Sequence, residues 1–303
     1  MLLSVGLYLA VLVSADAGKV LAAAARLSLQ GWCAILLLSV ANYVLRFARW
    51  HVYLRTLGHR LPIAPHFAIY LSGFALTTTP GKAGEAIRSL YLHEHGVSYP
   101  HSIAALFSER LIDLLAMLAL AGLGVVALGV SGTWVAVGLA VGAVAVLALR
   151  SPRVVAIVGG LPLSQPRLAH WRNHFVHLLQ ASSALLRVRL LVAAVVLGIV
   201  SWGAEGAGLF VVTQSMQLPV DAMRAIGIYA LAMLGGAASF VPGGLGGAEG
   251  VMGALLVASG APLPEAIAAT LICRAATLWF AILLGMISMA ILQARKSWQT
   301  TTS

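Results

Sequence analysis

Long apolar runs recur along the chain, around residues 32–45, 102–130, 133–149, 190–212 and 266–292. Each approaches or exceeds the roughly 20 residues that an α-helix needs to cross the hydrocarbon core of a bilayer. The pattern therefore predicts an all-α polytopic membrane protein. We place its six transmembrane helices at about 2–23, 32–52, 101–129, 132–149, 189–213 and 263–293.

The first of these spans competes with a second interpretation. The apolar run Leu2–Val13 is followed by the small residues Ser14 and Ala15, which resembles the end of a signal peptide. No Lys or Arg precedes the run, however, and apolar residues resume at Val20–Ala25. We therefore expect the first span to be retained.

Two further apolar regions, 64–95 and 219–259, are interrupted at their centres by Pro-Gly sequences. Each is predicted to form two short helices joined by a glycine-rich tip. Backbone that lacks helical hydrogen bonds is tolerated at membrane depth only where protein or a watery cavity satisfies it. Both regions are therefore interpreted as re-entrant helical hairpins. Their tips are formed by Pro80, Gly81, Gly84, Pro242, Gly243, Gly244 and Gly246.

Composition and charge agree with a membrane protein. Hydrophobic residues make up 60% of the 303 residues and charged residues only 9%, whereas soluble domains carry about 25% charged residues. The formal net charge is +10. Because no basic arm is interleaved with aromatic residues, a nucleic-acid partner is not expected.

The basic residues lie mostly on one side of the predicted topology. If the N-terminus is cytoplasmic, the outer side holds only Lys19, Arg26 and Arg224. The inner side holds Arg46, Arg49, Arg55, Arg60, Arg150, Arg153, Arg167, Arg172, Arg187, Arg189, Arg295 and Lys296. The positive-inside rule predicts this asymmetry. We expect a bacterial inner-membrane protein with both termini in the cytoplasm, organised as a single membrane domain over residues 1–303.

The chain contains an internal repeat. The segment from Gly96 to Arg110 matches the segment from Gly260 to Arg274 at an offset of 164 residues, with Gly, Pro, Ile-Ala-Ala and Arg in corresponding places. The two helices that follow cross the predicted membrane in opposite directions. Inverted repeats with interrupted helices at corresponding positions are typical of secondary transporters. Repeat one covers about 30–131, a cytoplasmic connection covers 150–188, and repeat two covers 189–293.

Nine ionisable residues are predicted to lie at membrane depth: Lys82, Glu85, Arg88, Glu109, Arg110, Asp113, Glu205, Glu249 and Arg274. A single charge at the bilayer centre costs about 2.5–3.5 kcal/mol. These residues must therefore pair with one another or face an aqueous cavity. Their helical spacing permits pairing, because several of them are three or four residues apart. Glu205 aside, four acids and four bases can form one network.

The first hairpin tip suits an anion. Thr79 can cap a helix that starts at Pro80, which directs free backbone amides and the positive end of the helix dipole into the membrane centre. Lys82 and Arg88 would add positive charge, and a lipid phosphate is the natural ligand. The alternative is that the charged network only holds the helices together.

These segments resemble a known family. The stretch Pro80–Glu85, the element Glu109–Asp113 and the tip Pro242–Gly246 with Glu249 look like the flippase-like membrane domain of lysylphosphatidylglycerol synthases. Stand-alone relatives include hopanoid-associated membrane proteins, and the resemblance covers nearly the whole chain. It implies an inner-membrane protein that moves, or helps to move, a lipid between leaflets. The synthases also carry a cytosolic aminoacyl-transferase domain, for which this chain has no room, so we do not expect lipid synthesis.

We favour a lipid flippase that moves a phospholipid or a polyprenyl- or hopanoid-type lipid through a charged cavity at the midplane. The residues predicted to bind it are Thr79, Lys82, Glu85, Arg88, Glu109, Arg110, Asp113, Glu249 and Arg274. Among them Lys82 and Arg88 would hold phosphate, and the acids would balance charge, bind a cationic headgroup or carry a coupling proton. Lys82 does not belong to a nucleotide-binding loop, because the other glycines of that motif are missing.

Two alternatives stay open at this point. The protein could be an intramembrane lipid-modifying enzyme, or a non-transporting partner of a lipid synthase or glycosyltransferase. Membrane lipids with anionic or zwitterionic headgroups are the expected partners, with a lipid-synthesising enzyme as a further one. No catalytic residue, metal or cofactor is expected.

Overall fold

The structure is a computed structural model that describes residues 17–79, 84–129, 131–160 and 166–301. Within this part of the chain, all regular secondary structure is helical. Five segments are long and apolar enough to cross a membrane: Leu29–Thr56, Tyr99–Leu128, Thr133–Arg150, Val188–Ser215 and Leu263–Ala294. They coincide with five of the six predicted spans. The other predicted span, 2–23, lies largely outside the described residues.

Local capping sets several helix boundaries. Helix α3 (Leu29–Thr56) begins after Ser28, whose Oγ accepts a hydrogen bond from the Gly31 amide at 3.1 Å. Helix α6 (Tyr99–Leu128) ends at Gly129, which adopts a left-handed φ of 64° that suits glycine. Helix α11 (Ala222–Ala238) begins after Asp221, whose carboxylate accepts a hydrogen bond from the Arg224 amide at 2.9 Å.

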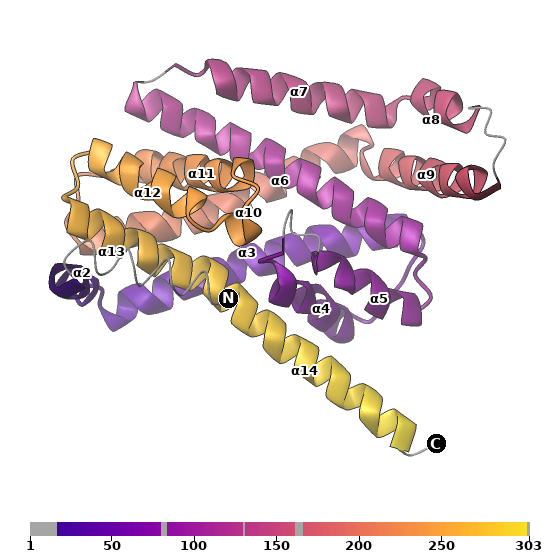
Figure 1. Ribbon diagram of the computed structural model, residues 1–303, viewed down its shortest axis with the longest axis horizontal. Coiled ribbons are helices and arrows are strands. Elements are labelled where there is room, and N and C mark those ends of the chain that lie inside the picture. Colours follow the sequence, from indigo (N-terminus) through magenta and orange to yellow (C-terminus); the bar gives the residue numbers. More distant parts are fainter. Residues whose placement is uncertain (1–16, 80–83, 130, 161–165, 302–303) are drawn as a thin grey trace.

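The other long helices complete a bundle of roughly antiparallel elements (Figure 1). They are α7 (Thr133–Arg150), α10 (Val188–Ser215), α13 (Leu263–Arg274) and α14 (Phe280–Thr301). A π-helical turn, Ala275–Trp279, joins α13 to α14. Helix α2 (Ala17–Ala24) lies near the start of the described chain, and α8 (Pro152–Gly159) and α9 (Pro166–Leu185) form the connection between the predicted repeats.

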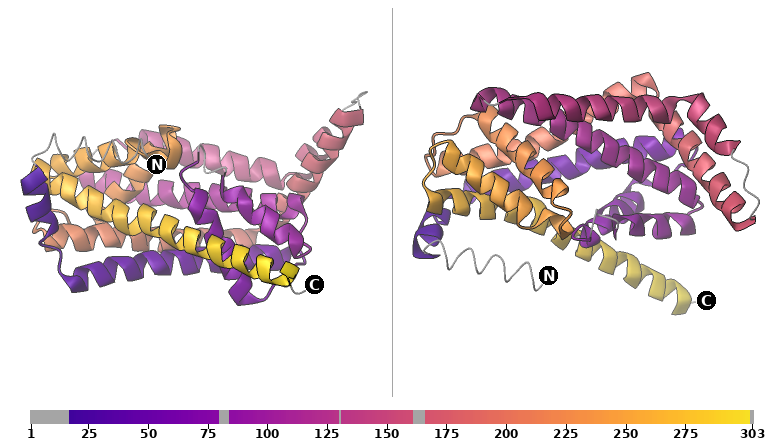
Figure 2. Two further views of the ribbon diagram at one scale, coloured as in Figure 1. Left: turned by 60° about the horizontal axis from the view of Figure 1, so that its bottom comes forward. Right: turned by 45° about the horizontal axis from the view of Figure 1, so that its top comes forward.

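Two helical hairpins enter the bundle from opposite ends. The first consists of α4 (Ile63–Ser72), the 3-10 turn η1 (Gly73–Leu76) and α5 (Ile87–Glu94). The second consists of α11, the turn η3 (Pro242–Gly244) and α12 (Gly247–Ala258). Figures 1 and 2 show the first hairpin at the end where α8 and α9 lie, and the second at the end next to α2.

The two hairpin tips meet inside the bundle. A Cβ atom added to Gly243 would lie 3.2 Å from Cγ2 of Thr78 and 3.5 Å from its Cα. Thr78 belongs to the first hairpin and Gly243 to the second. The contact brings together segments that are far apart in the sequence, as predicted for two opposed tips.

Each hairpin is packed into a hydrophobic core cluster of its own. One cluster surrounds α11 and α12 and includes Tyr229, Met252 and Ile272. The other surrounds α4 and α5 and includes Trp50 and Tyr70. The helices α3, α6 and α10 contribute buried residues to both clusters, so they join the two halves of the molecule.

Glycines permit close helix packing at two crossings. Where α6 crosses α11, a Cβ atom on Gly227 would lie only 2.0 Å from Cα of Gly124. Where α14 passes η1, a Cβ atom on Gly285 would lie 2.2 Å from the Ala75 amide nitrogen. Small residues allow such approach in membrane helices, where packing rather than hydrophobic burial drives association.

The matching sequence segments adopt matching structure. Gly96 and Gly260 both have a left-handed φ, of 81° and 94°. The helices that follow them begin at Tyr99 and at Leu263, again 164 residues apart. The outer face of the bundle is apolar, with side chains such as Trp134 (83% exposed) and Val126 (77% exposed) directed outward. Such a surface suits contact with lipid.

Candidate functional site

A cluster of four arginines and three carboxylates lies where α3, the start of α5 and α6 meet. Its members are Arg46, Arg49, Glu85, Arg88, Glu109, Arg110 and Asp113. We call it the arginine cluster. Four of these predicted site residues, Glu85, Arg88, Glu109 and Asp113, are buried within it. Because arginines outnumber carboxylates by one, the cluster carries one positive charge in excess.

Helix α3 supplies two arginines from adjacent turns of one face. Nη2 of Arg46 lies 3.3 Å from Oε1 of Glu109 and 3.6 Å from Oδ2 of Asp113. Nη2 of Arg49 donates a hydrogen bond to Oδ1 of Asp113. Arg46 is 5% exposed and Arg49 is 2% exposed. Both guanidinium groups therefore depend on the two acids of α6 for their charge balance.

The predicted topology counts Arg46 and Arg49 with the basic residues of the inner side, but the structure buries both inside the bundle. Both lie inside the predicted span 32–52, among the buried aromatic residues Tyr43, Phe47 and Trp50. Counting basic residues by side treats an arginine near the end of a span as a loop residue. Their position within an apolar helix was the signal that could have placed them in the charged network.

The first hairpin contributes Arg88, whose two terminal nitrogens are both paired with acids. Its Nη1 donates to Oε2 of Glu109 at 3.0 Å, and its Nη2 donates to Oε2 of Glu85. Its guanidinium carbon lies 4.3 Å from the ring centroid of Tyr70, and the Tyr70 hydroxyl donates to Oε1 of Glu109 at 2.7 Å. The structure thus places Arg88 inside the cluster rather than on a cavity wall.

A separate ion pair holds the second hairpin tip. Nε of Arg274 lies 2.7 Å from Oε1 of Glu249, and Nη2 of Arg274 donates to the Gly243 carbonyl at 3.0 Å. Oε2 of Glu249 accepts a hydrogen bond from the Gly246 amide at 2.7 Å. Among the described residues, the predicted charged network is therefore divided into two groups, one at each tip.

A cavity of about 350 Å³ separates the two charged groups. Both tips contribute to its wall. The predicted site residues that line it are Thr79, Arg110, Asp113, Gly243, Gly244 and Arg274. Apolar side chains complete the lining, among them Met117, Trp202, Met233 and Phe240. Of the predicted site residues, these are the ones that the structure brings to one place.

Arg110 is the arginine of the arginine cluster that reaches this cavity. Its side chain is 25% exposed, and Nη2 lies 3.0 Å from Oδ2 of Asp113 and 3.1 Å from Oε1 of Glu109. Nε and Nη2 nevertheless make no hydrogen bond of good geometry within the described part of the chain. Because these two atoms are buried, an anionic group in the cavity would meet the exposed remainder of the guanidinium.

The first tip is closed by Thr79. Its Oγ1 accepts a hydrogen bond from the Gly84 amide at 2.6 Å and donates to the Leu76 carbonyl at 2.8 Å. Residues 84–86 form a 3-10 turn, and α5 itself begins at Ile87. Pro80, Gly81 and Lys82, which were predicted to start the helix and to hold phosphate, lie outside the described residues.

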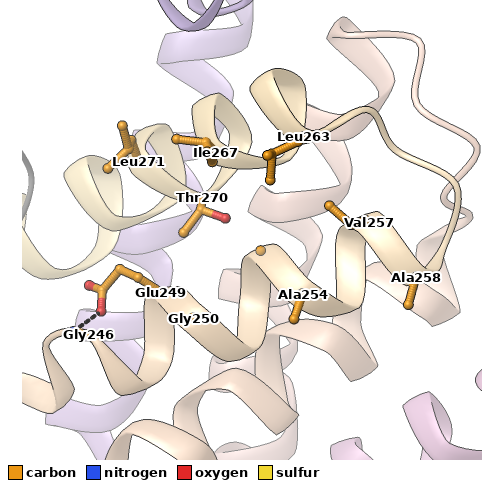
Figure 3. Close-up of a pocket in the computed structure, with 11 residues that line it drawn as sticks. Gly246, Glu249, Gly250, Ala254, Val257, Ala258, Leu263, Ile267, Thr270 and Leu271 are labelled. Carbon is orange, nitrogen blue, oxygen red and sulfur yellow. Dashed lines mark hydrogen bonds between the residues drawn. The ribbon is translucent and has the colours of Figure 1, made fainter. Parts of the chain in front are cut away.

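An apolar groove of about 630 Å³ adjoins the second ion pair. Figure 3 shows it between α12, which contributes Ala254 and Val257, and α13, which contributes Leu263 and Ile267. Glu249 lies at one end of the groove, where its carboxylate accepts the hydrogen bond from Gly246. The second tip thus borders both the cavity between the tips and this apolar groove.

Fold and site together define a multi-pass helical membrane protein with a charged cavity between two hairpin tips. Residues 1–285 match the family described as the lysylphosphatidylglycerol synthase TM region, and the chain belongs to this family. The match confirms the resemblance found in the sequence. A search among curated proteins gives no match.

Proposed function

We propose that the protein carries a lipid with an anionic or zwitterionic headgroup between the two leaflets of a bacterial inner membrane. The observation that carries the proposal is the cavity between the tips, with Arg110 on one wall and Arg274 on the other. The headgroup occupies this cavity while the acyl chains stay in the hydrocarbon. The apolar groove between α12 and α13 lies beside the second tip, where such chains would pass.

Charge favours a phosphate as the group that is bound. The arginine cluster has one positive charge in excess, and burial of an unbalanced charge at membrane depth costs about 2.5–3.5 kcal/mol. A phosphate beside Arg110 offsets this charge and can meet the part of the Arg110 side chain that is exposed, 25% in all. Phospholipids and polyprenyl phosphates share this chemistry.

The arrangement of the hairpins supports alternating access. Two hairpins enter from opposite ends, and the segments Gly96–Arg110 and Gly260–Arg274 correspond in sequence and in helix start. We infer an inverted-topology repeat with six membrane-spanning helices and two re-entrant hairpins. In transporters of this design one half rocks against the other around a fixed midplane site. The lipid would then be exposed to each leaflet in turn.

We place the end of the bundle that carries α8 and α9 in the cytoplasm. The segments near that end include Arg60, Arg150, Arg153 and Arg187, whereas the other end has few basic residues. The positive-inside rule supports this orientation. In it the first hairpin enters from the cytoplasm and the second from outside.

Transport also suits the site better than catalysis. Glu85, Glu109, Asp113 and Glu249 are each paired with an arginine. A general acid or base has to exchange protons at neutral pH, whereas acids in close ion pairs are held ionised. The acids therefore serve to position arginines, and arginines that face a cavity serve to bind an anion.

The test is lipid translocation by the purified protein in phosphatidylcholine liposomes that contain fluorescently labelled phosphatidylglycerol. Arg110→Gln removes the cationic group that faces the cavity while leaving most of the cluster in place. A hydrogen bond to a charged group contributes about 1.5–3 kcal/mol, so we expect a loss of rate of roughly 10- to 100-fold.

Arg60→Gln is the matched control, since Arg60 is an exposed arginine outside the cluster. Size-exclusion profiles and thermal unfolding in detergent show whether each variant is folded. If the wild-type protein moves no labelled lipid, or folded Arg110→Gln moves it as fast as Arg60→Gln, the proposal is wrong. Co-purification of inactive wild-type protein with a lipid synthase would favour the role of a non-transporting partner.

A further inference from the structure

One acidic residue at membrane depth stands apart from both charged groups. Glu205 lies in the interior of α10 and is 3% exposed. Its described hydrogen bond comes from Ser39, whose Oγ donates to Oε2 at 3.1 Å. Among the described residues, Glu205 takes part in no ion pair. The acids of the arginine cluster and Glu249 all do.

A carboxylate in this position is not compensated as the other acids are. A single hydroxyl donor is neutral and cannot offset a full negative charge that has been removed from water. Burial by itself favours the neutral form of such a carboxyl group, so its protonation depends on how much positive charge lies nearby. Ser39 can hydrogen-bond to either form, so the contact does not prevent protonation or release.

The surroundings of Glu205 connect it to both tips. The titratable and charged groups that act on its carboxyl come from three helices packed around α10. They are Tyr43 and Arg46 on α3, Tyr229 on α11, and Cys273 and Arg274 on α13. Helix α6 also packs against α10 and carries Glu109, Arg110 and Asp113 of the arginine cluster. One arginine from each charged group, Arg46 and Arg274, therefore interacts electrostatically with the Glu205 carboxyl group.

Helix α10 also links Glu205 to the cavity. Trp202, one turn before Glu205, lines the cavity, and the Arg46 guanidinium lies 4.9 Å from its ring centroid. An anion that enters the cavity changes the electrostatic field at Arg46 and Arg274. Glu205 is the acid that can respond by gaining or losing a proton, because the other acids are held by arginines.

We propose that Glu205 is a proton-binding site that couples proton movement to the movement of an anionic lipid. The inference rests on the proposed function. The excess positive charge of the arginine cluster can be balanced either by the Glu205 carboxylate or by the phosphate of a bound lipid. When the phosphate binds, the carboxylate takes a proton from water and becomes neutral. When the lipid leaves, the proton returns to water, on the side to which the cavity is then open.

Thermodynamic linkage makes this coupling reciprocal. Lipid binding favours proton uptake, and proton binding favours lipid binding by the same factor. Proton and anionic lipid therefore travel in the same direction. A zwitterionic lipid, whose headgroup brings no net charge, drives less proton uptake than phosphatidylglycerol does.

The test uses full-length protein in phosphatidylcholine liposomes that contain fluorescently labelled phosphatidylglycerol, with and without a pH gradient. We expect a gradient that is acidic on the side of the labelled lipid to accelerate its translocation about tenfold, within the usual range of coupling between two sites. Glu205→Gln keeps the shape and an acceptor for Ser39 but cannot ionise. It should still move lipid, without any response to the gradient. Glu205→Asp should keep the response.

Glu265→Gln is the control, because Glu265 is an acid at the start of α13, outside both charged groups. A second readout is proton uptake in weakly buffered detergent solution, measured with a pH-sensitive dye as phosphatidylglycerol is added. Wild type and Glu265→Gln should take up protons, and Glu205→Gln should not.

The outcomes separate this inference from the proposed function. If wild-type protein moves no lipid at any pH, the proposed function fails. If wild-type protein moves lipid without any response to the gradient, or if Glu205→Gln responds as the wild type does, the proton site is wrong and transport stands.

Discussion

At the scale of single residues, the polar interior of this protein is formed by buried arginines and the groups that surround them. Arg49 and Arg88 are among its largest fully buried side chains. A buried arginine is tolerated because acids and aromatic faces surround it. The guanidinium group of Arg88, for example, lies 5.2 Å from the Trp50 ring and 4.3 Å from the Tyr70 ring. The stability of the protein should therefore be sensitive to the loss of any acid in the cluster.

Asp113→Asn tests this dependence. The change leaves Arg49, which is 1% exposed at its side chain, without its closest carboxylate. Removing one partner of a buried ion pair typically costs about 3–5 kcal/mol, because the remaining charge is left uncompensated. We expect a loss of that size in the free energy of unfolding, measured by tryptophan fluorescence in mixed detergent micelles.

Glu265→Gln provides the comparison for that measurement. Glu265 pairs with Arg26 at 3.8 Å, and the Arg26 side chain is 51% exposed. Exposed pairs contribute about 0–1 kcal/mol. Equal losses for the two variants would show that the arginine cluster does not stabilise the fold.

At the scale of helices and turns, apolar periodicity predicts where the spans lie but not how they are bent. The five described spans agree with the sequence prediction because a run of about 20 apolar residues is itself the physical requirement for crossing a bilayer. The π-helical turn after Arg274 was not predicted. Such turns are rare and often lie at functional sites, and here the Tyr43 hydroxyl donates to the Thr277 carbonyl at 2.8 Å.

The candidate site was predicted only in part for a related reason. Spacing within one helix shows which charges can pair locally, and it placed Glu109, Arg110 and Asp113 together. It does not show which helices are neighbours. Arg46 and Arg49 lie more than 60 residues before Asp113, and the bundle brings them into contact. The sequence alone therefore does not show that four arginines share the arginine cluster, or that the cluster has one positive charge in excess.

The crossing of α6 and α11 yields a prediction at this scale. A Cβ atom on Gly124 would lie 2.7 Å from Cα of Gly227, and backbone atoms cannot move aside as a flexible side chain can. Gly124→Ala should therefore lower the free energy of unfolding by about 1–3 kcal/mol, the usual cost of overpacking. The same fluorescence measurement in mixed micelles checks it.

Gly122→Ala is the matched control on the same helix. A Cβ atom on Gly122 would meet only Cγ1 of Val135 at 3.9 Å, an ordinary contact distance. Alanine also favours the helix over glycine by up to about 1 kcal/mol. Gly122→Ala should leave stability unchanged or raise it slightly. A similar loss for both variants would contradict the proposed close crossing.

At the scale of the whole molecule, the proposed transport requires the contact between the tips to change as the cavity opens to one leaflet and then to the other. The two core clusters share α3, α6 and α10, so each half can pack around its own hairpin while these helices stay common to both. The tips approach each other at Thr78 and Gly243. Rocking of one half against the other would have to break the contact between the tips or slide one tip past the other.

A cross-link between the tips tests whether such motion is needed. The positions of Thr78 and Gly243 are close enough for a disulfide, since a Cβ atom at residue 243 would lie 3.5 Å from Cα of Thr78. The double variant Thr78→Cys and Gly243→Cys is made in a background with Cys33→Ser and Cys273→Ala. The left-handed φ of 69° at residue 243 adds a strain of about 1–2 kcal/mol.

Oxidation should stop lipid translocation in liposomes, and reduction should restore it. Each single-cysteine variant should be insensitive to oxidant. Full translocation by protein that is shown to be cross-linked would mean that lipid passes while the tips stay together, so the path could not depend on rocking of the two halves.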